Sequence, residues 1–135
     1  MATLDDVSRL AARLPETTQV ERHGNRAWSV TLSSGKRDVF AWERPFSKAD
    51  IKRYGDAPVP EGPIVATAVG DLAEKEAVLA AGTPGVFTIP HFNGYAAVLI
   101  SLPDVAEPAL EAALVDAWLA KAPSRLSAAY LAAEP

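Results

Sequence analysis

Apolar residues at the start of the chain recur at the spacing of a helix. Leu4, Val7 and Leu10 lie three positions apart, which predicts an amphipathic helix with one face on a core. Thr3 with Asp6 is typical of a capping box, in which a hydroxyl and a carboxylate satisfy the first free backbone N–H groups. A helix is therefore predicted to begin at residue 4.

The same spacing returns near the C-terminus. Leu110, Leu114 and Trp118 form one apolar stripe, and Pro108 occupies a first-turn position where proline is tolerated. A helix is predicted over 107–121, followed by a short one after Pro123. A further helix is predicted over 72–81, because Asp71 provides a cap and Gly82 a stop.

Alternating apolar and polar residues predict strands in the remaining segments. Trp28, Val30 and Leu32 alternate with polar positions. The Ser-Ser-Gly sequence at 33–35 predicts a hairpin turn that returns over 38–42. Residues 64–69 predict another strand. A second hairpin is predicted to pair 88–90 with 96–102 around a turn at 91–95.

The segment 43–62 separates two of these strands by 20 residues. Structureless connections of this length are uncommon in compact domains and are often functional. Ser47 with Asp50 predicts one or two capped helical turns within it, with Lys48 and Lys52 on one side. The order of elements predicts one domain over 1–135 with the α+β fold: a two-layer sandwich with a mainly antiparallel sheet covered by helices on one face.

Composition narrows the class of protein. The chain has no cysteine, which excludes disulfides and thiol catalysis. Its apolar runs are too short to span a bilayer, and residues 1–15 lack the uninterrupted apolar stretch of a signal peptide. No nucleophile elbow or phosphate loop occurs, and His23 and His91 lack the spacing of metal ligands. We therefore expect a cytoplasmic protein, monomeric or weakly dimeric, without catalytic residues, metal or cofactor.

Charge is distributed unevenly. The formal net charge is −4, which disfavours nucleic-acid binding. Residues 22–53 nevertheless hold eight basic and three acidic side chains. This block is either a solvated face or a local basic patch. As a patch it would contact DNA phosphates through Arg26, Lys36, Arg37, Arg44, Lys48, Lys52 and Arg53.

The turn at 91–95 is a second candidate site. His91, Asn93 and Tyr95 place hydrogen-bonding groups beside an apolar strand, so they are candidate ligand-binding residues. A structural role is the alternative, because Gly94 permits positive φ and Pro90 fixes the entry to the turn. The three tryptophans have two interpretations as well: exposed rings would stack on bases, but their phasing favours the core.

Several motifs together resemble a known family. They are the Pro-His-aromatic-x-Gly-Tyr turn at 90–95, a Trp-bearing helix at 107–119, Ala-Pro-x-Arg-Leu at 122–126, and the earlier Ala27-Trp28 and Phe40-Ala-Trp42. The pattern resembles the MmcQ/YjbR family of small bacterial proteins over nearly the whole chain. The resemblance implies a CyaY-like (frataxin-like) fold, no defining catalytic motif and a suggested role in DNA binding, through an architecture likened to a double wing.

Two functions remain open from the sequence. One is weak DNA binding, directed to the phosphate backbone through residues 22–53. The other is a module that binds a small ligand or a protein through the sheet face and the 43–62 segment. Iron handling, known for frataxins, is not expected, because the first helix carries only Asp5 and Asp6 as acids, with Arg9 and Arg13 following.

Overall fold

The computed structural model describes residues 2–133, so Met1, Glu134 and Pro135 of the expected domain lie outside the described residues. Three strands follow the first helix, helices and strands then alternate up to the last strand, and two helices end the described chain. A 3-10 helix (η1) precedes the last strand. The elements are α1 (Leu4–Ala11), β1 (Thr17–Arg22), β2 (Asn25–Thr31), β3 (Arg37–Glu43), α2 (Lys48–Arg53), β4 (Ile64–Ala68), α3 (Leu72–Ala80), β5 (Val86–Phe87), η1 (Pro90–Phe92), β6 (Ala97–Ser101), α4 (Glu107–Lys121) and α5 (Ser124–Ala133).

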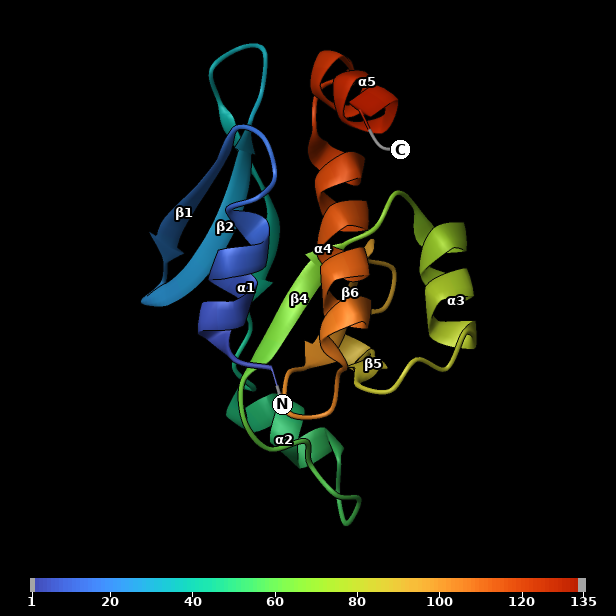
Figure 1. Cartoon of the computed structure of the whole chain (residues 1–135). Coiled ribbons are helices and arrows are strands. Elements are labelled where there is room, and N and C mark those ends of the chain that lie inside the picture. The colour runs from blue at the N-terminus through green and yellow to red at the C-terminus, as the bar shows by residue number, and fades with distance from the viewer. Residues whose placement is uncertain (1, 134–135) are drawn as a thin grey trace.

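The strands form one six-stranded sheet in the order β1-β2-β3-β4-β6-β5, and neighbouring strands pair antiparallel (Figure 1). The predicted α+β fold class is confirmed. The first predicted hairpin is confirmed too, with Val30 opposite Asp38 and Thr31 opposite Arg37. Within residues 2–133, no helix combines the length and apolar character needed to cross a bilayer.

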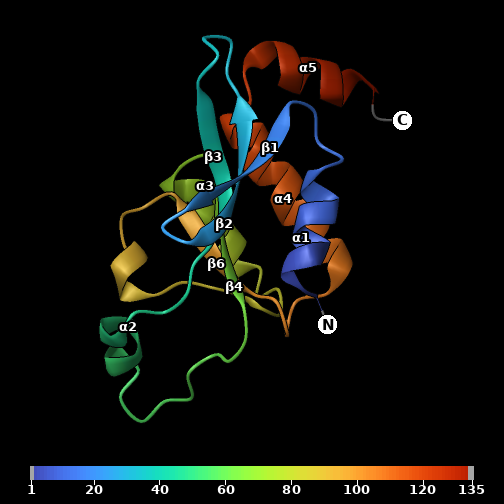
Figure 2. The same cartoon turned by 90° about the vertical axis from the view of Figure 1, so that its left-hand side faces the viewer.

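Helices α1 and α4 cover one face of the sheet (Figure 2). Helix α4 buries the predicted stripe of Leu110, Leu114 and Trp118, each no more than 1% exposed. The indole Nε1 of Trp118 donates a hydrogen bond of 3.0 Å to the Pro15 carbonyl oxygen. Trp28 packs in the same core from β2. The core interpretation is therefore confirmed for Trp118 and Trp28.

The opposite face of the sheet carries a second, smaller core, which α2 and η1 flank (Figure 2). Buried Ile64, Ala66 and Leu99 come from the central strands, and Phe92 covers them from η1. Trp42 packs against this cluster but stays only half-buried. One tryptophan thus remains partly open to solvent.

A β-bulge in β3 decides which face Trp42 joins. Trp28 pairs with Ala41 but Ser29 pairs with Val39, so Phe40 is an extra residue in β3. Such a bulge shifts the alternation of side chains along the strand. Phe40 and Ala41 both lie in the helix-covered core, and Trp42 lies on the opposite face.

Local capping signals in the sequence are confirmed. The predicted capping boxes are present at Thr3 with Asp6 and at Ser47 with Asp50. One strand was missed and one strand prediction is wrong. Strand β1 was not predicted, because Thr17–Arg22 contains a single apolar residue at the sheet edge. The strand predicted at 88–90 is wrong: β5 is Val86–Phe87, and Pro90 instead begins η1.

Candidate functional site

The candidate site lies on the sheet face opposite α1 and α4, where Trp42 meets the turn after η1. The Trp42 and Phe92 rings stack with centroids 6.4 Å apart, and Tyr95 meets both edge-on at 6.2 and 5.7 Å. Ring pairs of this geometry stabilise one another beyond the area they bury. Tyr95 remains 55% exposed. The result is a fixed aromatic surface that solvent can reach.

Arg44 adds a cation to this aromatic surface. Arg44 is two residues after Trp42 and so lies on the same face of the extended chain. Its guanidinium carbon lies 5.6 Å from the centroid of the Phe92 ring, within the range of a cation–π interaction. The same guanidinium donates to the Pro45 carbonyl oxygen and pairs with Asp50 at 3.1 Å. Arg44 is therefore held in one orientation before any ligand arrives.

Asp50 is the anchor of this arrangement. Its side chain is 1% exposed and accepts a 2.9 Å hydrogen bond from the Ser47 backbone N–H. A second arginine, Arg53, lies 3.5 Å from its other oxygen. Burial raises the pKa of the Asp50 carboxyl, but the hydrogen bonds from Ser47 and the charge of Arg44 outweigh it, so the pKa lies below its ordinary value. Asp50 remains ionised and ties α2 to the end of β3.

The turn at 91–95 is anchored by a buried lysine on α3. Lys75 is 6% exposed, and its Nζ donates to the backbone carbonyl oxygens of Phe92 at 2.6 Å and Tyr95 at 2.8 Å. Burial lowers the pKa of its ammonium. These two bonds fix the backbone on both sides of Asn93 and Gly94, so Lys75 positions the Tyr95 ring.

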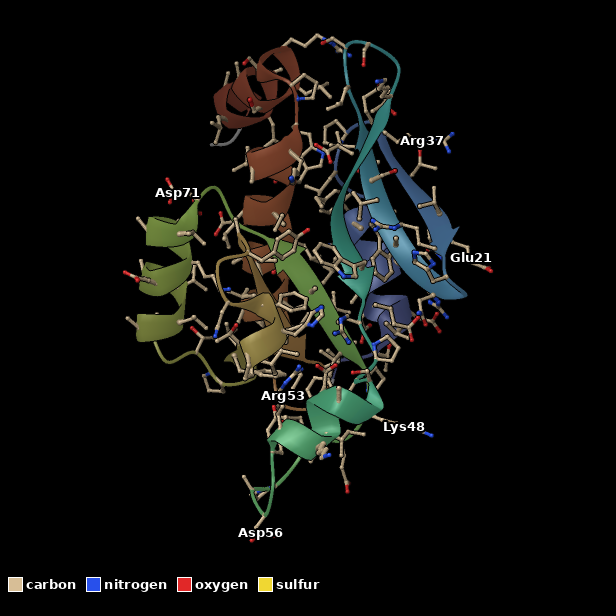
Figure 3. The ribbon with its side chains drawn as sticks, turned by 180° about the vertical axis from the view of Figure 1, so that it is seen from behind. Glu21, Arg37, Lys48, Arg53, Asp56 and Asp71 are labelled. Atoms are coloured by element: carbon tan, nitrogen blue, oxygen red, sulfur yellow. The ribbon has the colours of Figure 1, made fainter. Side chains whose placement is uncertain are left out.

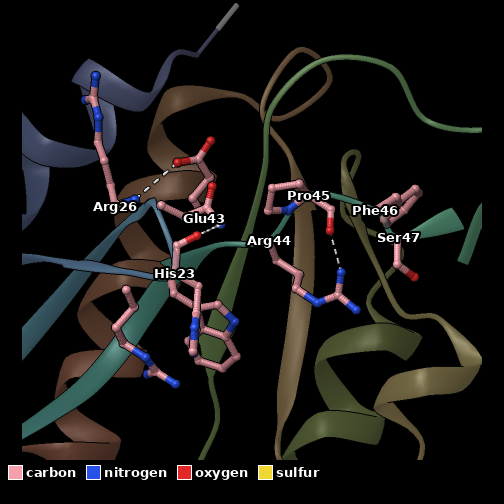
Figure 4. Close-up of a pocket in the computed structure, with 10 residues that line it drawn as sticks. His23, Arg26, Glu43, Arg44, Pro45, Phe46 and Ser47 are labelled. Carbon is pink, nitrogen blue, oxygen red and sulfur yellow. Dashed lines mark hydrogen bonds between the residues drawn. The ribbon is translucent and has the colours of Figure 1, made fainter.

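A cavity of about 350 Å³ opens beside Trp42 and Arg44 (Figure 4). One wall is the β1–β2 hairpin, whose two-residue turn is His23-Gly24 with φ of +52° and +79°. Positive φ at both turn residues matches the twist of paired strands and gives a tight connection. The lining residues are Arg22, His23, Asn25, Arg26, Trp42, Glu43, Arg44, Pro45, Phe46 and Ser47.

The cavity has a cationic lining. The lining includes three arginines and His23 but only one carboxylate, that of Glu43. The Arg26 guanidinium points away toward α1 (Figure 4), where it pairs with Asp5 at 2.8 Å. The Glu43 carboxylate accepts a hydrogen bond from the Arg26 backbone N–H at 3.2 Å. Arg22 forms no ion pair within residues 2–133 and is exposed, so it is available to an anion.

The predicted DNA-contacting residues fall into separate groups. Lys36 and Arg37 lie at the β2–β3 hairpin tip, whereas Lys48, Lys52 and Arg53 lie on α2. Figure 3 shows Arg37 toward one end of the molecule and both Lys48 and Arg53 toward the other. Arg26 and Arg44 are engaged by Asp5 and Asp50. The basic block is thus not one continuous face.

Of the three predicted ligand-binding residues, only one is part of the aromatic surface. Tyr95 joins the aromatic surface, while His91 and Asn93 are exposed on the same turn. The structure therefore brings Tyr95 together with Arg44, which the sequence assigned to a different candidate site. Within residues 2–133, no three potential metal-ligating side chains gather in one place.

No family model matches the chain. The uncharacterized protein Rv2570 of Mycobacterium tuberculosis is 43% identical over 136 residues, and the match covers 98% of both chains. The uncharacterized protein Mb2600 of Mycobacterium bovis matches to the same extent. The chain belongs to the Rv2570 family. Members of the Rv2570 family named here are bacterial and carry no assigned function.

A solved structure shares the fold of this Rv2570-family protein. It is the crystal structure of Deinococcus radiodurans protein DR2400, a DUF419 domain, with a TM-score of 0.59 and 19% identity over 88% of this chain and 78% of that one. At this identity the likeness shows the fold alone. The α+β fold expected from the sequence therefore agrees with a solved structure. The family shown by sequence identity is that of Rv2570.

Sequence reasoning missed part of the site in this Rv2570-family chain. Arg22 was counted in the basic block but not selected, and His23 and Phe92 were not selected at all. One signal was available: Arg22 and His23 precede Gly24, and a Gly at the second turn position is typical of a two-residue hairpin loop. No local pattern indicates that this turn lies beside Trp42.

Proposed function

We propose that the protein is a non-enzymatic binding protein whose cavity beside Trp42 takes a small anionic ligand with a planar ring, of the mononucleotide class. The observation that carries this proposal is the combination of the half-buried Trp42 ring with the free Arg22 and the fixed Arg44 around one cavity of about 350 Å³. That volume falls within the range of small-molecule sites.

The two halves of such a ligand match two parts of the cavity. A planar base stacks on Trp42, since aromatic side chains accept any base on their π-face. A phosphate is met by Arg22 and Arg44, because guanidinium groups bind phosphate oxygens with charge-assisted hydrogen bonds. Asp50 and Pro45 hold Arg44 in place, which lowers the entropic cost of binding.

We also propose that the chain is related to the MmcQ/YjbR family that its motifs resemble. The motif at 90–95 supplies Phe92 and Tyr95, whose rings contact Trp42 of the cavity but do not line the cavity themselves. We infer a cytoplasmic, monomeric or weakly dimeric protein that needs no metal or cofactor. Ligand binding, rather than catalysis, is supported by a site built of arginines and rings with no nucleophile paired to a base.

The test is calorimetric titration with AMP, ribose 5-phosphate and adenosine. We expect AMP to bind most tightly, because only AMP engages both the ring and the arginines. Arg22→Gln should weaken AMP binding about tenfold, the scale of one charge-assisted hydrogen bond, and Trp42→Leu should remove the preference for AMP over ribose 5-phosphate. Arg125→Gln, an exposed change on α5, is the control. Equal affinity for AMP and adenosine, with no effect of Arg22→Gln, contradicts the proposal.

Duplex DNA is a second candidate, and the hairpin tip favours it. Lys36 and Arg37 are exposed and form no ion pairs within residues 2–133, and a protruding basic hairpin suits phosphate contacts. Affinity for a short duplex should then fall with salt, with a log–log slope of roughly −0.9 per phosphate neutralised. Removing both side chains should flatten the slope by about 1–2 units. Fluorescence anisotropy across a salt series measures this, and identical slopes for both proteins would eliminate the candidate.

A further inference from the structure

A second cavity lies between α3, α4 and the strands β4 and β6. Its volume is about 220 Å³, and its walls are aliphatic, including Val78 from α3, Val98 from β6 and Ala113 from α4. Helix α3 buries only Lys75 of its own residues, so it packs loosely against this part of the molecule. The gap beside it is consequently not closed by side chains.

Two carboxylate side chains line this cavity, and no basic side chain lines it. Glu74 of α3 and Asp116 of α4 both line it at its solvent-exposed rim, and its lining contains no lysine, arginine or histidine. Glu74 accepts a 3.0 Å hydrogen bond from the Gly70 backbone N–H. The Asp116 carboxylate has no hydrogen bond or ion pair within residues 2–133. Burial, followed by the charge of Glu74, raises the pKa of Asp116, as expected for an anion without a counter-ion.

A polar group is also present on the sheet side. Thr67 of β4 lines the cavity, is 1% exposed, and has no side-chain hydrogen bond to the described part of the chain. The Thr67 hydroxyl therefore has hydrogen-bonding capacity left for a ligand in the cavity. Both Thr67 and Asp116 would therefore gain a partner from a ligand that carries donors.

We propose that this cavity is a second ligand site, which binds a small primary amine with an apolar body. The aliphatic walls accept the body of the ligand, and the ammonium pairs with Asp116 and Glu74. An anion is disfavoured by two carboxylates and the absence of a lining cation. A neutral apolar molecule would gain nothing from the two carboxylates, whereas an amine pairs with them. This site is independent of the nucleotide site, because the two cavities share no lining residue.

The test is an NMR titration of the whole chain with three probes of similar shape and different charge: phenethylamine, phenethyl alcohol and hydrocinnamate. We expect phenethylamine to bind most tightly and to shift the backbone signals of Thr67, Val78, Val98 and Ala113. Asp116→Asn should weaken phenethylamine binding about tenfold while leaving the alcohol unaffected. This variant should fold, because Asp116 is exposed and makes no hydrogen bond or ion pair within residues 2–133.

Glu76→Gln is the matched control, since Glu76 is exposed on α3 and does not line the cavity. It should bind phenethylamine like the wild type. The proposal is overturned by any of three results: equal affinities for the amine and the alcohol, unchanged amine affinity in Asp116→Asn, or no shift of the four backbone signals at millimolar amine. Shifts confined to the residues that line the cavity beside Trp42 would likewise overturn it.

Discussion

Replacing Trp118 with alanine should lower the free energy of unfolding by about 3–5 kcal/mol, the range for truncating a large buried aromatic side chain. The indole is 0% exposed and joins α4 to the sheet core. It also contacts Tyr130 of α5 with ring centroids 5.2 Å apart. The substitution therefore creates a cavity where three elements meet. Urea denaturation measured by far-UV circular dichroism gives the difference.

Two further variants show which interaction is responsible. Trp118→Phe keeps most of the apolar volume but removes the Nε1 donor to Pro15, so it should cost only about 1–2 kcal/mol. Leu131→Ala, on a residue 56% exposed, should change stability by less than about 0.5 kcal/mol. A loss below about 1 kcal/mol for Trp118→Ala would show that the ring does not belong to the core in solution.

Features governed by neighbouring residues could be predicted from the sequence. The capping boxes at Thr3 and Ser47 and the cap at Asp71 depend on residues three positions apart, so their pattern is visible in the chain. The apolar stripe of α4 likewise needs only helical periodicity. These local signals predicted the helices and the central hairpin, and they led to the correct fold class.

The candidate site could not be predicted in the same way, because it depends on contacts between distant segments. Simple alternation would place Phe40 and Trp42 on the same face of β3. The bulge at Phe40 separates them and turns Trp42 toward Phe92. A bulge arises from pairing with a neighbouring strand and has no reliable local signal. The aromatic surface depends on this bulge, because the bulge places Trp42 on the same face as Phe92.

The surroundings of charged residues depend on distant contacts in the same way. Lys75 occurs on a helix among exposed residues, where its sequence context indicates a solvated side chain. Only the tertiary structure brings the Phe92 and Tyr95 carbonyl groups within reach of its ammonium. The basic residues of 22–53 are adjacent in sequence, but antiparallel strands carry them to opposite ends of the molecule (Figure 3).

Replacing Asp50 with alanine should destabilise the protein by about 3–5 kcal/mol, because it leaves the partly buried Arg44 without its counter-ion. The variant also loses the cap of α2 and the pair with Arg53. Asp50→Asn keeps an acceptor for the Ser47 N–H but removes the charge, so its loss should be smaller. Asp56→Asn, an exposed carboxylate in the same segment, is the control and should be nearly neutral.

The Asp50 contribution should also depend on pH, with a sign that follows from its lowered pKa. The carboxyl binds its proton less readily in the folded chain than in the unfolded chain, where the ordinary value of 3.8 applies. Its stabilising effect is therefore complete above the unfolded pKa and is lost as pH falls through the folded one. The stability difference between wild type and Asp50→Asn should shrink below about pH 4 and remain constant near neutrality. Urea denaturation of both proteins across this range measures it. A constant difference down to strong acid would show that the Asp50 charge does not hold Arg44, and that the cap alone accounts for its role.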